Sequence, residues 1–355
     1  MRTQSILSSL LAALVLLPSA SFLRAQKPIP VKVVVVAMFE VGQDTGDGPG
    51  EYQYWVERDH LDHVYPLPAA YHAARMNDSG ELAIVTGAGT AHAASTIMAL
   101  GLDPRFDLTH AYWVIAGIAG GTPARVSLGS AVWARYVVDA DLAYEIDARE
   151  IPSDWPTGFI PLGKTHPYET PVAPRENQAF ALNPSFTQWA FNLTKDTPLA
   201  DPDKLKSARA AFDGAASQLP PRVFLGDEIS SSTFWHGKLL DAWADQWMSY
   251  FTDGKGQFAT TAMEDTGSLL SLRYLAAAGR ADINRVLVLR TVSNFDQQPR
   301  GITAAESLSR QRIGTYSAFL PALESAYTVG HVVVNELITH WQTYADHIPT
   351  APPAN

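Results

Sequence analysis

The stretch 285–298, RVLVLRTVSNFDQQ, begins as a strand and continues into side chains that could do chemistry. The run from Val286 to Leu289 is typical of a strand that is buried on both faces. The polar side chains that follow are Arg290, Thr291, Ser293, Asn294 and Asp296. Ligands of open α/β sheets bind at the carboxyl ends of strands, so this row favours a binding or catalytic site. The alternative is an ordinary polar loop, in which Asp296 caps or turns the chain.

Two glycine-rich stretches also follow predicted strands. In TGAGTAHAA, 86–94, a strand ends and a helix begins, so free backbone N–H groups could bind an anion or a sugar hydroxyl. In AGIAGG, 116–121, small residues would let the backbone approach a planar ligand. The candidate contact residues are Gly87, Gly89, Thr90, Gly117, Ala119 and Gly120. The alternatives are a tight turn for the first stretch, and a bulge or close strand packing for the second.

Three carboxylates stand at the predicted ends of strands or the start of a helix. In AMED, 262–265, Met263 offers an apolar surface and Glu264 a carboxylate that could accept hydrogen bonds from two adjacent hydroxyls, as on a ribose. Glu40 and Asp227 each follow a predicted strand, where a base that activates water could lie. The alternatives are a charge that complements the helix dipole for Glu264, and caps or turns for the other two.

Several kinds of chemistry are excluded by what the chain lacks. Cysteine is absent, which excludes thiol catalysis and cysteine-ligated metal sites. His60 and His63 lie three apart, but there is no HExxH pattern and no adjoining third ligand. The DTGDG stretch lacks the alternating oxygen ligands of a calcium loop, and no GxSxG elbow indicates a serine hydrolase. We therefore predict neither a metal nor a cofactor.

Composition and the N-terminal segment indicate an exported globular protein. The 355 residues are 46% apolar and 17% charged, and the net charge of −10 argues against binding a nucleic-acid backbone. Residues 1–25 combine Arg2 with a short apolar run and small residues, which predicts a signal peptide and a periplasmic or extracellular location; the alternative is an uncleaved anchor. After residue 30 no apolar run approaches the roughly 18 residues of a membrane span.

Strands and helices alternate along the chain, which predicts an α/β fold with a largely parallel sheet. The predicted strands are 31–39, 81–85, 111–121, 222–225 and 285–292, and 130–147 is predicted as one long strand or a strand pair. The predicted helices are 68–76, 91–100, 233–251, 266–280 and 327–344. Residues 148–222 are rich in Pro, Asp, Asn and Ser, so we interpret them as a long irregular insertion with one or two helices. The expected organisation is one domain, 26–345, followed by a tail, 346–355.

Together the motifs resemble a known superfamily. VVVVAMFE, TGAGTAHAA, AGIAGG, FLGDEI, and AMEDTG followed by VLVLRTVSNFDQ occur in the order found in nucleoside phosphorylases and nucleosidases. DTGDGPGEYQYW and GDEISSSTFWHG resemble more closely the purine nucleoside permease family of exported bacterial and fungal proteins, over nearly all of 30–345. The resemblance implies a three-layer α/β/α domain with a twisted mixed central sheet, assembled as a homo-oligomer. It also implies cleavage of the N-glycosidic bond of a purine nucleoside by phosphate or by water.

The resemblance also implies roles for individual residues. Ala119 and Gly120 would lie nearest the base and ribose, Ile229 would approach the base, Met263 would pack on the ribose, and Glu264 would hold its hydroxyls. These roles describe a nucleoside or nucleobase bound across the carboxyl ends of the strands.

At two positions the chain departs from the superfamily pattern. Asn294 stands where many members keep an aspartate that protonates purine N7, and its amide can donate one hydrogen bond and accept another. Glu40 lies one position from the water-activating glutamate of nucleosidases, and Asp296 is the alternative acid for the base. Phosphate-binding arginines are not evident before AGIAGG, where Tyr112 and Trp113 stand, and this favours hydrolysis over phosphorolysis.

The sequence therefore predicts an exported protein that cleaves purine nucleosides for uptake and salvage. The alternative is a nucleoside-binding protein that serves transport across the membrane without chemistry. The expected partner is a purine nucleoside or nucleobase, with phosphate as a further candidate ligand.

Overall fold

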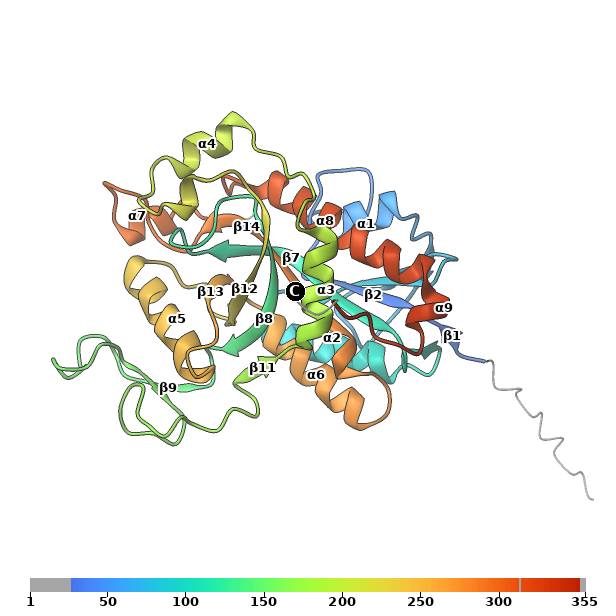
Figure 1. Cartoon of the computed structure of the whole chain (residues 1–355), viewed down its shortest axis with the longest axis horizontal. Coiled ribbons are helices and arrows are strands. Elements are labelled where there is room, and N and C mark those ends of the chain that lie inside the picture. The colour runs from blue at the N-terminus through green and yellow to red at the C-terminus, as the bar shows by residue number, and fades with distance from the viewer. Residues whose placement is uncertain (1–26, 313, 352–355) are drawn as a thin grey trace, which may run out of the picture.

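The computed structural model describes residues 27–312 and 314–351, and in it a mixed sheet lies between two helical layers (Figure 1). This is the three-layer α/β/α arrangement that the sequence predicts. The predicted signal peptide, residues 1–25, lies outside the described residues. No helix in the described ranges combines the length and the apolar character needed to cross a membrane.

A ten-stranded sheet forms the middle layer of the described chain. Its strands are β2 (Val33–Ala37), β3 (His63–Tyr65), β4 (Ala74–Met76), β5 (Glu81–Val85), β7 (Tyr112–Gly121), β8 (Ala131–Asp139), β11 (Ala179–Ala181), β12 (Val223–Ser230), β13 (Phe258–Ala262) and β14 (Val286–Phe295). Two short pairs stand apart, namely β1 (Ile29–Pro30) with β6 (Phe106–Asp107) and β9 (Ala143–Glu145) with β10 (Phe159–Pro161).

Strand β14 closes part of the sheet on itself. It pairs in parallel with β7 and antiparallel with β8, while β8, β12, β13 and β7 are neighbours in that order. These strands therefore form a closed circuit, from which β2, β5, β4 and β3 continue as an open sheet. All residues of β14 are buried, including the polar ones at its end, so the strand is longer than the predicted apolar run suggested.

Helices cover the open part of the sheet on both faces (Figure 1). The helices are α1 (Gln53–Arg58), α2 (Thr90–Leu102), α3 (Pro184–Thr194), α4 (Asp203–Arg209), α5 (Lys238–Phe251), α6 (Asp265–Ala277), α7 (Ala304–Leu308), α8 (Phe319–Thr339) and α9 (Trp341–Tyr344). One hydrophobic cluster joins α2 and α6 to the sheet, and another joins α1, α3 and α8 to its opposite face. A third, rich in tryptophan, lies between α5 and the strands β8, β12 and β13.

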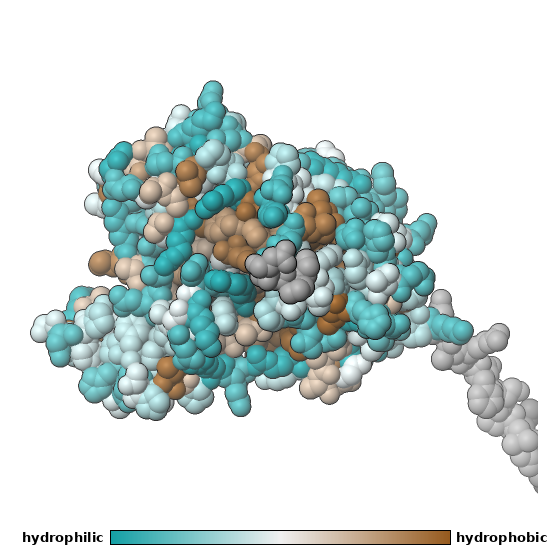
Figure 2. All heavy atoms as spheres, viewed as in Figure 1, coloured by the Kyte–Doolittle hydropathy of each residue, from teal (hydrophilic) through white to brown (hydrophobic). Residues whose placement is uncertain are grey.

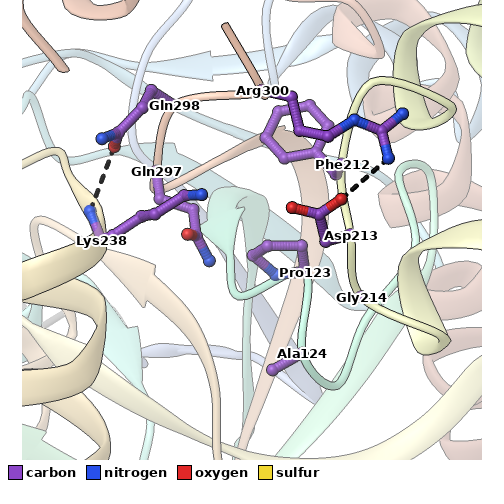
Figure 3. Close-up of a pocket in the computed structure, with 9 residues that line it drawn as sticks. All are labelled: Pro123, Ala124, Phe212, Asp213, Gly214, Lys238, Gln297, Gln298 and Arg300. Carbon is purple, nitrogen blue, oxygen red and sulfur yellow. Dashed lines mark hydrogen bonds and ion pairs between the residues drawn. The ribbon is translucent and has the colours of Figure 1, made fainter. Parts of the chain in front are cut away.

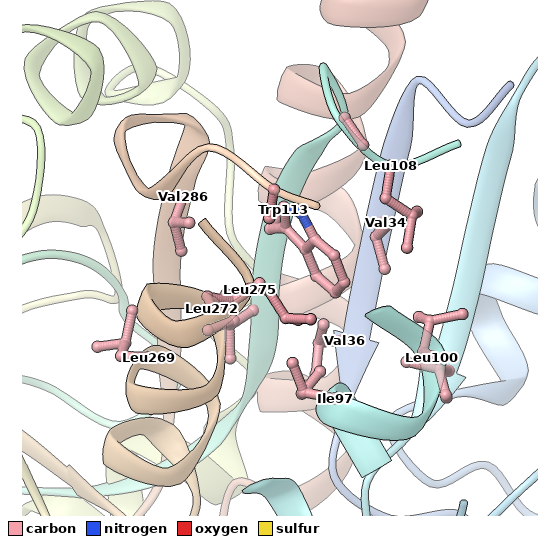
Figure 4. Packing of buried hydrophobic residues seen from close by; sticks show 14 of the residues in the cluster. Val34, Val36, Ile97, Leu100, Leu108, Trp113, Leu269, Leu272, Leu275 and Val286 are labelled. Carbon is pink, nitrogen blue, oxygen red and sulfur yellow. The ribbon is translucent and has the colours of Figure 1, made fainter. Parts of the chain in front are cut away.

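The helices α2 and α6 approach each other closely above the strands (Figure 4). Ile97 and Leu100 of α2 and Leu272 of α6 are fully buried in the same cluster as the strand residues beneath them. A Cβ atom on Gly101 would lie 2.2 Å from Leu275 of α6, so a glycine is needed at this contact. The glycine thus lets α2 and α6 approach closely. The stretches that follow β5 and β13 lead into these two helices.

Two predictions about the elements are wrong. The predicted helix 68–76 is a series of turns followed by β4, in which Ala74 and Met76 are buried and pair antiparallel with β5. Local helix propensity is overridden there by pairing at the sheet edge. Asp227 does not end its strand either, because β12 continues to Ser230 through an irregularity beside Asp227.

The stretch 148–222 contains β10, β11, α3 and α4, joined by long connections. Strand β11 pairs with β8 at the edge of the sheet, and α3 contributes Phe186 and Ala190 to the core cluster beneath α8. On the face drawn in Figure 2 hydrophilic residues predominate, and apolar residues form smaller patches among them.

We predict that Gly101→Val lowers the free energy of unfolding by about 1–3 kcal/mol, because the added methyl groups overlap Leu275 and force α2 away from α6. Urea denaturation measures the change. Ser95→Val, on the exposed side of the same helix, is the matched control and should stay within about 0.5 kcal/mol. Equal losses in both variants would contradict the close-packing explanation.

Candidate functional site

A pocket opens where the carboxyl ends of β2, β7, β13 and β14 meet. Its lining residues are Met38, Phe39, Glu51, Ala88, Ile118, Ala119, Gly120, Phe234, Thr261, Ala262, Met263, Glu264, Ser293, Asn294 and Tyr316. The lining is mainly apolar and aromatic, and its polar groups are few. A small-molecule site usually has this composition, with a few placed polar groups that fix orientation.

Glu51 is a polar group of this pocket that the sequence analysis does not single out. Its two carboxylate oxygens accept hydrogen bonds from the backbone N–H groups of Met38 and Ile118, each at 2.7 Å. A Cβ atom on Gly117 would lie 2.4 Å from the nearer oxygen, so the glycine leaves room for this carboxyl group. Burial, opposed in part by the positive charge of Arg290, raises the pKa of Glu51 to about 8.

Glu264 is the second carboxyl group of the pocket, at the start of α6. It accepts hydrogen bonds from the backbone N–H groups of Gly89 at 3.3 Å and Met263 at 3.0 Å. Burial raises its pKa, and the nearby Arg290 guanidinium opposes that effect. The contact with Gly89 brings the glycine turn after β5 beside the AMED stretch. Two stretches that were predicted separately to bind a ligand are therefore neighbours.

Arg290 lies behind the pocket, almost fully buried among three carboxyl groups. Its guanidinium pairs with both oxygens of Asp265, lies 3.4 Å from Glu264 and 3.6 Å from Glu228. Burial alone would lower the pKa of Arg290, but these carboxylates raise it above its ordinary value, so the side chain stays charged. Its third nitrogen donates to the Ile118 carbonyl oxygen at 3.2 Å, so all three guanidinium nitrogens have acceptors in the protein.

Asn294 and Ser293 supply polar groups at the end of β14. The Ser293 hydroxyl lies 3.1 Å from the Ala119 carbonyl oxygen and 2.8 Å from the Asn294 side-chain oxygen. The Asn294 amide nitrogen has one longer contact, at 3.3 Å, with the carbonyl oxygen of Phe295. The amide N–H groups are therefore the part of this side chain that a ligand could engage.

Six of the predicted site residues lie together in this pocket. They are Ala119, Gly120, Met263, Glu264, Ser293 and Asn294.

Other predicted residues lie just outside the pocket. Gly117 contacts the pocket residue Glu51, and Asp296 lines a small compartment that adjoins the pocket. Gly87 and Gly89 flank the lining residue Ala88, and both have the positive φ that favours glycine. The Thr90 hydroxyl, just outside, hydrogen bonds with the Ser232 hydroxyl at 2.7 Å.

The other predicted residues lie away from the pocket lining. Glu40 accepts hydrogen bonds from the backbone N–H groups of Gly50, Tyr52 at 2.9 Å and Gln53 at 2.6 Å, so its carboxylate holds the loop before α1. Asp227 is buried in an ion pair with Arg135 at 2.6 Å. Neither carboxylate is free to face a ligand in this pocket.

Ile229 packs in the tryptophan-rich cluster beneath α5. It does not line the described pocket. The aromatic lining residues Phe39, Phe234 and Tyr316 are not among the predicted contacts. Phe39 lies in VVVVAMFE and Phe234 in GDEISSSTFWHG, two of the motifs that carry the family resemblance. The local pattern of these motifs does not show which side chains turn toward a pocket.

A separate cleft is lined by Pro123, Ala124, Phe212, Asp213, Gly214, Lys238, Gln297, Gln298 and Arg300 (Figure 3). Its ion pair, Arg300 with Asp213 at 2.8 Å, is more than half exposed on both sides. Exposed pairs of this kind are screened by solvent and contribute little. Its charged groups are solvated, unlike the buried carboxyl groups of the first pocket.

The comparison with family models identifies the chain's relatives. The model described as purine nucleoside permease matches residues 30–349. The chain belongs to the purine nucleoside permease family. The resemblance inferred from the motifs is thereby confirmed.

Members of the purine nucleoside permease family from two fungi are similar to the chain. A probable purine nucleoside permease of Schizosaccharomyces pombe is 29% identical over 95% of this chain and 97% of its own length. The purine nucleoside permease of Candida albicans is 29% identical over 73% of this chain, which spans 64% of that relative.

Solved structures share the fold of this permease-family chain. The futalosine hydrolase of Helicobacter pylori aligns with a TM-score of 0.52 over 86% of this chain and 98% of its own, at 12% identity. A putative 5'-methylthioadenosine/S-adenosylhomocysteine nucleosidase of Francisella philomiragia aligns with a TM-score of 0.52 over 85% and 98%, at 14% identity. These likenesses confirm the predicted fold class, a nucleosidase-like α/β domain.

We predict that Arg290→Met lowers the free energy of unfolding by about 3–5 kcal/mol at neutral pH, because it leaves buried carboxylates without their counter-charge. The deficit should shrink as the pH falls, since protonation of those carboxyl groups in the folded state removes the unpaired charge. Chemical denaturation at several pH values measures both effects. Arg300→Met, which breaks the exposed pair of Figure 3, is the control and should cost about 0–1 kcal/mol. A loss in Arg290→Met that does not vary with pH would contradict the electrostatic explanation.

Proposed function

We propose that the chain binds purine nucleosides in this pocket and hydrolyses their N-glycosidic bond. The observation that carries the proposal is the meeting of two carboxyl groups, Glu51 and Glu264, with the Asn294 amide in one largely apolar pocket. Nucleoside cleavage needs a holder for ribose, a group that activates water and a donor for the departing base. The three side chains have the chemistry for these tasks.

Glu51 is the proposed base for water. Its pKa of about 8 is close to neutral pH, and a general base is most effective when its pKa is near the pH of the reaction. The backbone N–H groups of Met38 and Ile118 fix its carboxylate against the pocket wall. Glu51 thus takes the role that the sequence analysis assigns to Glu40.

Glu264 and Asn294 are proposed to bind the two ends of the nucleoside. The Glu264 carboxylate would accept hydrogen bonds from the ribose hydroxyls, with Met263 packed against the sugar. The Asn294 amide would donate to the base, where negative charge develops as the glycosidic bond breaks. Ala119 and Gly120 are small, so they leave the backbone of β7 open to the purine ring of the bound nucleoside.

Water is favoured over phosphate as the second reactant. No arginine or lysine is present among the described residues that line the pocket. The nearby cation, Arg290, is already engaged by Asp265, Glu264 and Glu228. A phosphate dianion would therefore meet carboxyl groups without a compensating cation.

A nucleoside-binding protein without chemistry is the second candidate function. Asn294 favours it, because an amide cannot transfer a full proton to the base as a carboxylic acid can. The similarity to fungal purine nucleoside permeases also supports a role in nucleoside transport. On either reading we propose export through residues 1–25, assembly as a homo-oligomer and a role in uptake or salvage.

The first test measures the release of hypoxanthine from inosine, with and without phosphate, across pH. We expect release without phosphate, with kcat/KM rising about tenfold per pH unit below pH 8 and levelling above it, as Glu51 loses its proton. Glu51→Gln should lower kcat by about 10²–10⁴. Glu40→Gln weakens the hold on the loop that carries Glu51 and should lower activity in part, but it should keep the rise of kcat/KM toward pH 8, which decides between the two glutamates. Tight inosine binding without release at any pH would leave the binding function and exclude hydrolysis.

The second test separates ribose binding from stability. We predict that Glu264→Gln weakens inosine binding about 10- to 100-fold, because charge-assisted hydrogen bonds to hydroxyls contribute about 1.5–3 kcal/mol each. Glu228→Gln is the matched control, since it removes another carboxylate beside Arg290 that does not line the pocket. Titration calorimetry and denaturation of both variants would show a loss of affinity only in the first. Equal affinity losses would mean that Glu264 acts only through Arg290.

A further inference from the structure

A small compartment adjoins the proposed nucleoside pocket. It shares Gly120, Phe234, Thr261, Ala262, Met263 and Asn294 with that pocket and adds Thr233, Trp235 and Asp296. Its volume is about 20 Å³, which suits a single oxygen-sized group. The compartment therefore extends the pocket beyond Asn294.

Buried polar atoms around this compartment lack partners. The Trp235 indole N–H has no hydrogen-bond acceptor among the described residues, although the side chain is only 8% exposed. Neither carboxyl oxygen of Asp296, which is 1% exposed, receives a hydrogen bond from an N–H or hydroxyl group within the described ranges. Leaving a buried polar group unpaired costs about 1–3 kcal/mol, so the Trp235 N–H and an Asp296 oxygen that has no donor indicate a polar occupant.

Asp296 faces a second carboxyl group, Asp241 in the first turn of α5. Burial, with the Asp241 carboxyl group as the next cause, raises the pKa of Asp296 well above its ordinary value. The raised pKa favours the protonated form of Asp296, whose O–H can donate to Asp241 and whose carbonyl oxygen then remains as an acceptor. The residues that line the compartment thus carry donors on Asn294 and Trp235 and an acceptor on Asp296.

We propose that this compartment makes the site specific for 6-oxopurine nucleosides, an inference that rests on the proposed nucleoside binding. A 6-oxopurine presents acceptors at N7 and O6 and a donor at N1–H, which match Asn294, Trp235 and Asp296 in turn. An adenine presents N7 as an acceptor, an amino donor and N1 as an acceptor. Its amino group would face the Trp235 N–H and its N1 would face the Asp296 carbonyl oxygen.

The mismatch with adenine leaves two buried polar groups unpaired. A site built to hydrogen bond with a substrate discriminates strongly against an analogue that lacks the partner, because the protein groups stay desolvated without compensation. Hydrophobic contacts with Phe234 and Met263 would be the same for either base. Discrimination should therefore depend on the polar atoms of the compartment and not on its shape.

The test measures dissociation constants by titration calorimetry for inosine, adenosine and purine riboside, which carries only hydrogen at position six. Inosine should bind at least about tenfold tighter than the other two. Trp235→Phe removes the indole N–H and should weaken inosine binding about 3- to 10-fold, with changes of less than about twofold for adenosine and purine riboside. Asp296→Asn should preserve the preference, since its amide can donate to Asp241 and keep a carbonyl oxygen toward the ligand.

Trp243→Phe is the matched control. Trp243 belongs to the same aromatic cluster and its ring centroid lies 6.2 Å from that of Trp235, but it lines neither pocket nor compartment. It should leave the ratio of inosine to adenosine affinity unchanged. Equal binding of inosine and adenosine by the unaltered protein, or equal losses for both in Trp235→Phe, would overturn this inference while nucleoside binding stands. Failure of all three nucleosides to bind would overturn the proposed function and this inference with it.

Discussion

The buried guanidinium of Arg290 is the charge around which the site is built. It lies in a strand whose residues are all buried, so it must be neutralised by groups from the surrounding elements. Glu228 comes from β12, and Glu264 and Asp265 come from the start of α6. One cation thus ties β14, β12 and α6 into a single arrangement, and a shift in any of them would leave a charge unpaired.

The same arrangement sets the electrostatics of the pocket. Three carboxyl groups share Arg290, and Glu51 lies within reach of its field, so the buried cluster holds more acids than bases. Burial then raises the pKa of Glu51 and Glu264, as it does for Asp296 at the far side of the pocket. Carboxyl groups with a raised pKa reduce stability as the pH rises, because the unfolded chain releases their protons more readily. Such a cost is commonly found where a site needs acids and bases near neutral pH.

Local patterns predicted the elements wherever periodicity and burial agreed. The apolar runs of β2, β5, β7 and β14 and the spaced aromatics of α5 were identified, because a strand buried on both faces and an amphipathic helix each leave a repeating pattern. The helix predicted over 68–76 was wrong, since β4 depends on pairing with β5 and not on its own composition. Candidate residues at strand ends lay together in the pocket, because the carboxyl ends of these strands meet there.

The sequence by itself determined the family, the α/β class and the part of the candidate site at or just after strand ends, including Met263, Glu264 and Asn294. Met263 and Glu264 follow β13 and Asn294 lies near the end of β14, and a strand's direction fixes where its end lies. Only the tertiary structure decided that Glu51 and not Glu40 faces the pocket, that β14 closes the circuit of strands, and that Asp296 meets Asp241. The path of the loop before α1 and the register between distant strands depend on contacts between segments far apart in the chain. A local sequence pattern indicates whether a residue is buried, but it does not indicate which residue from a distant segment will contact it.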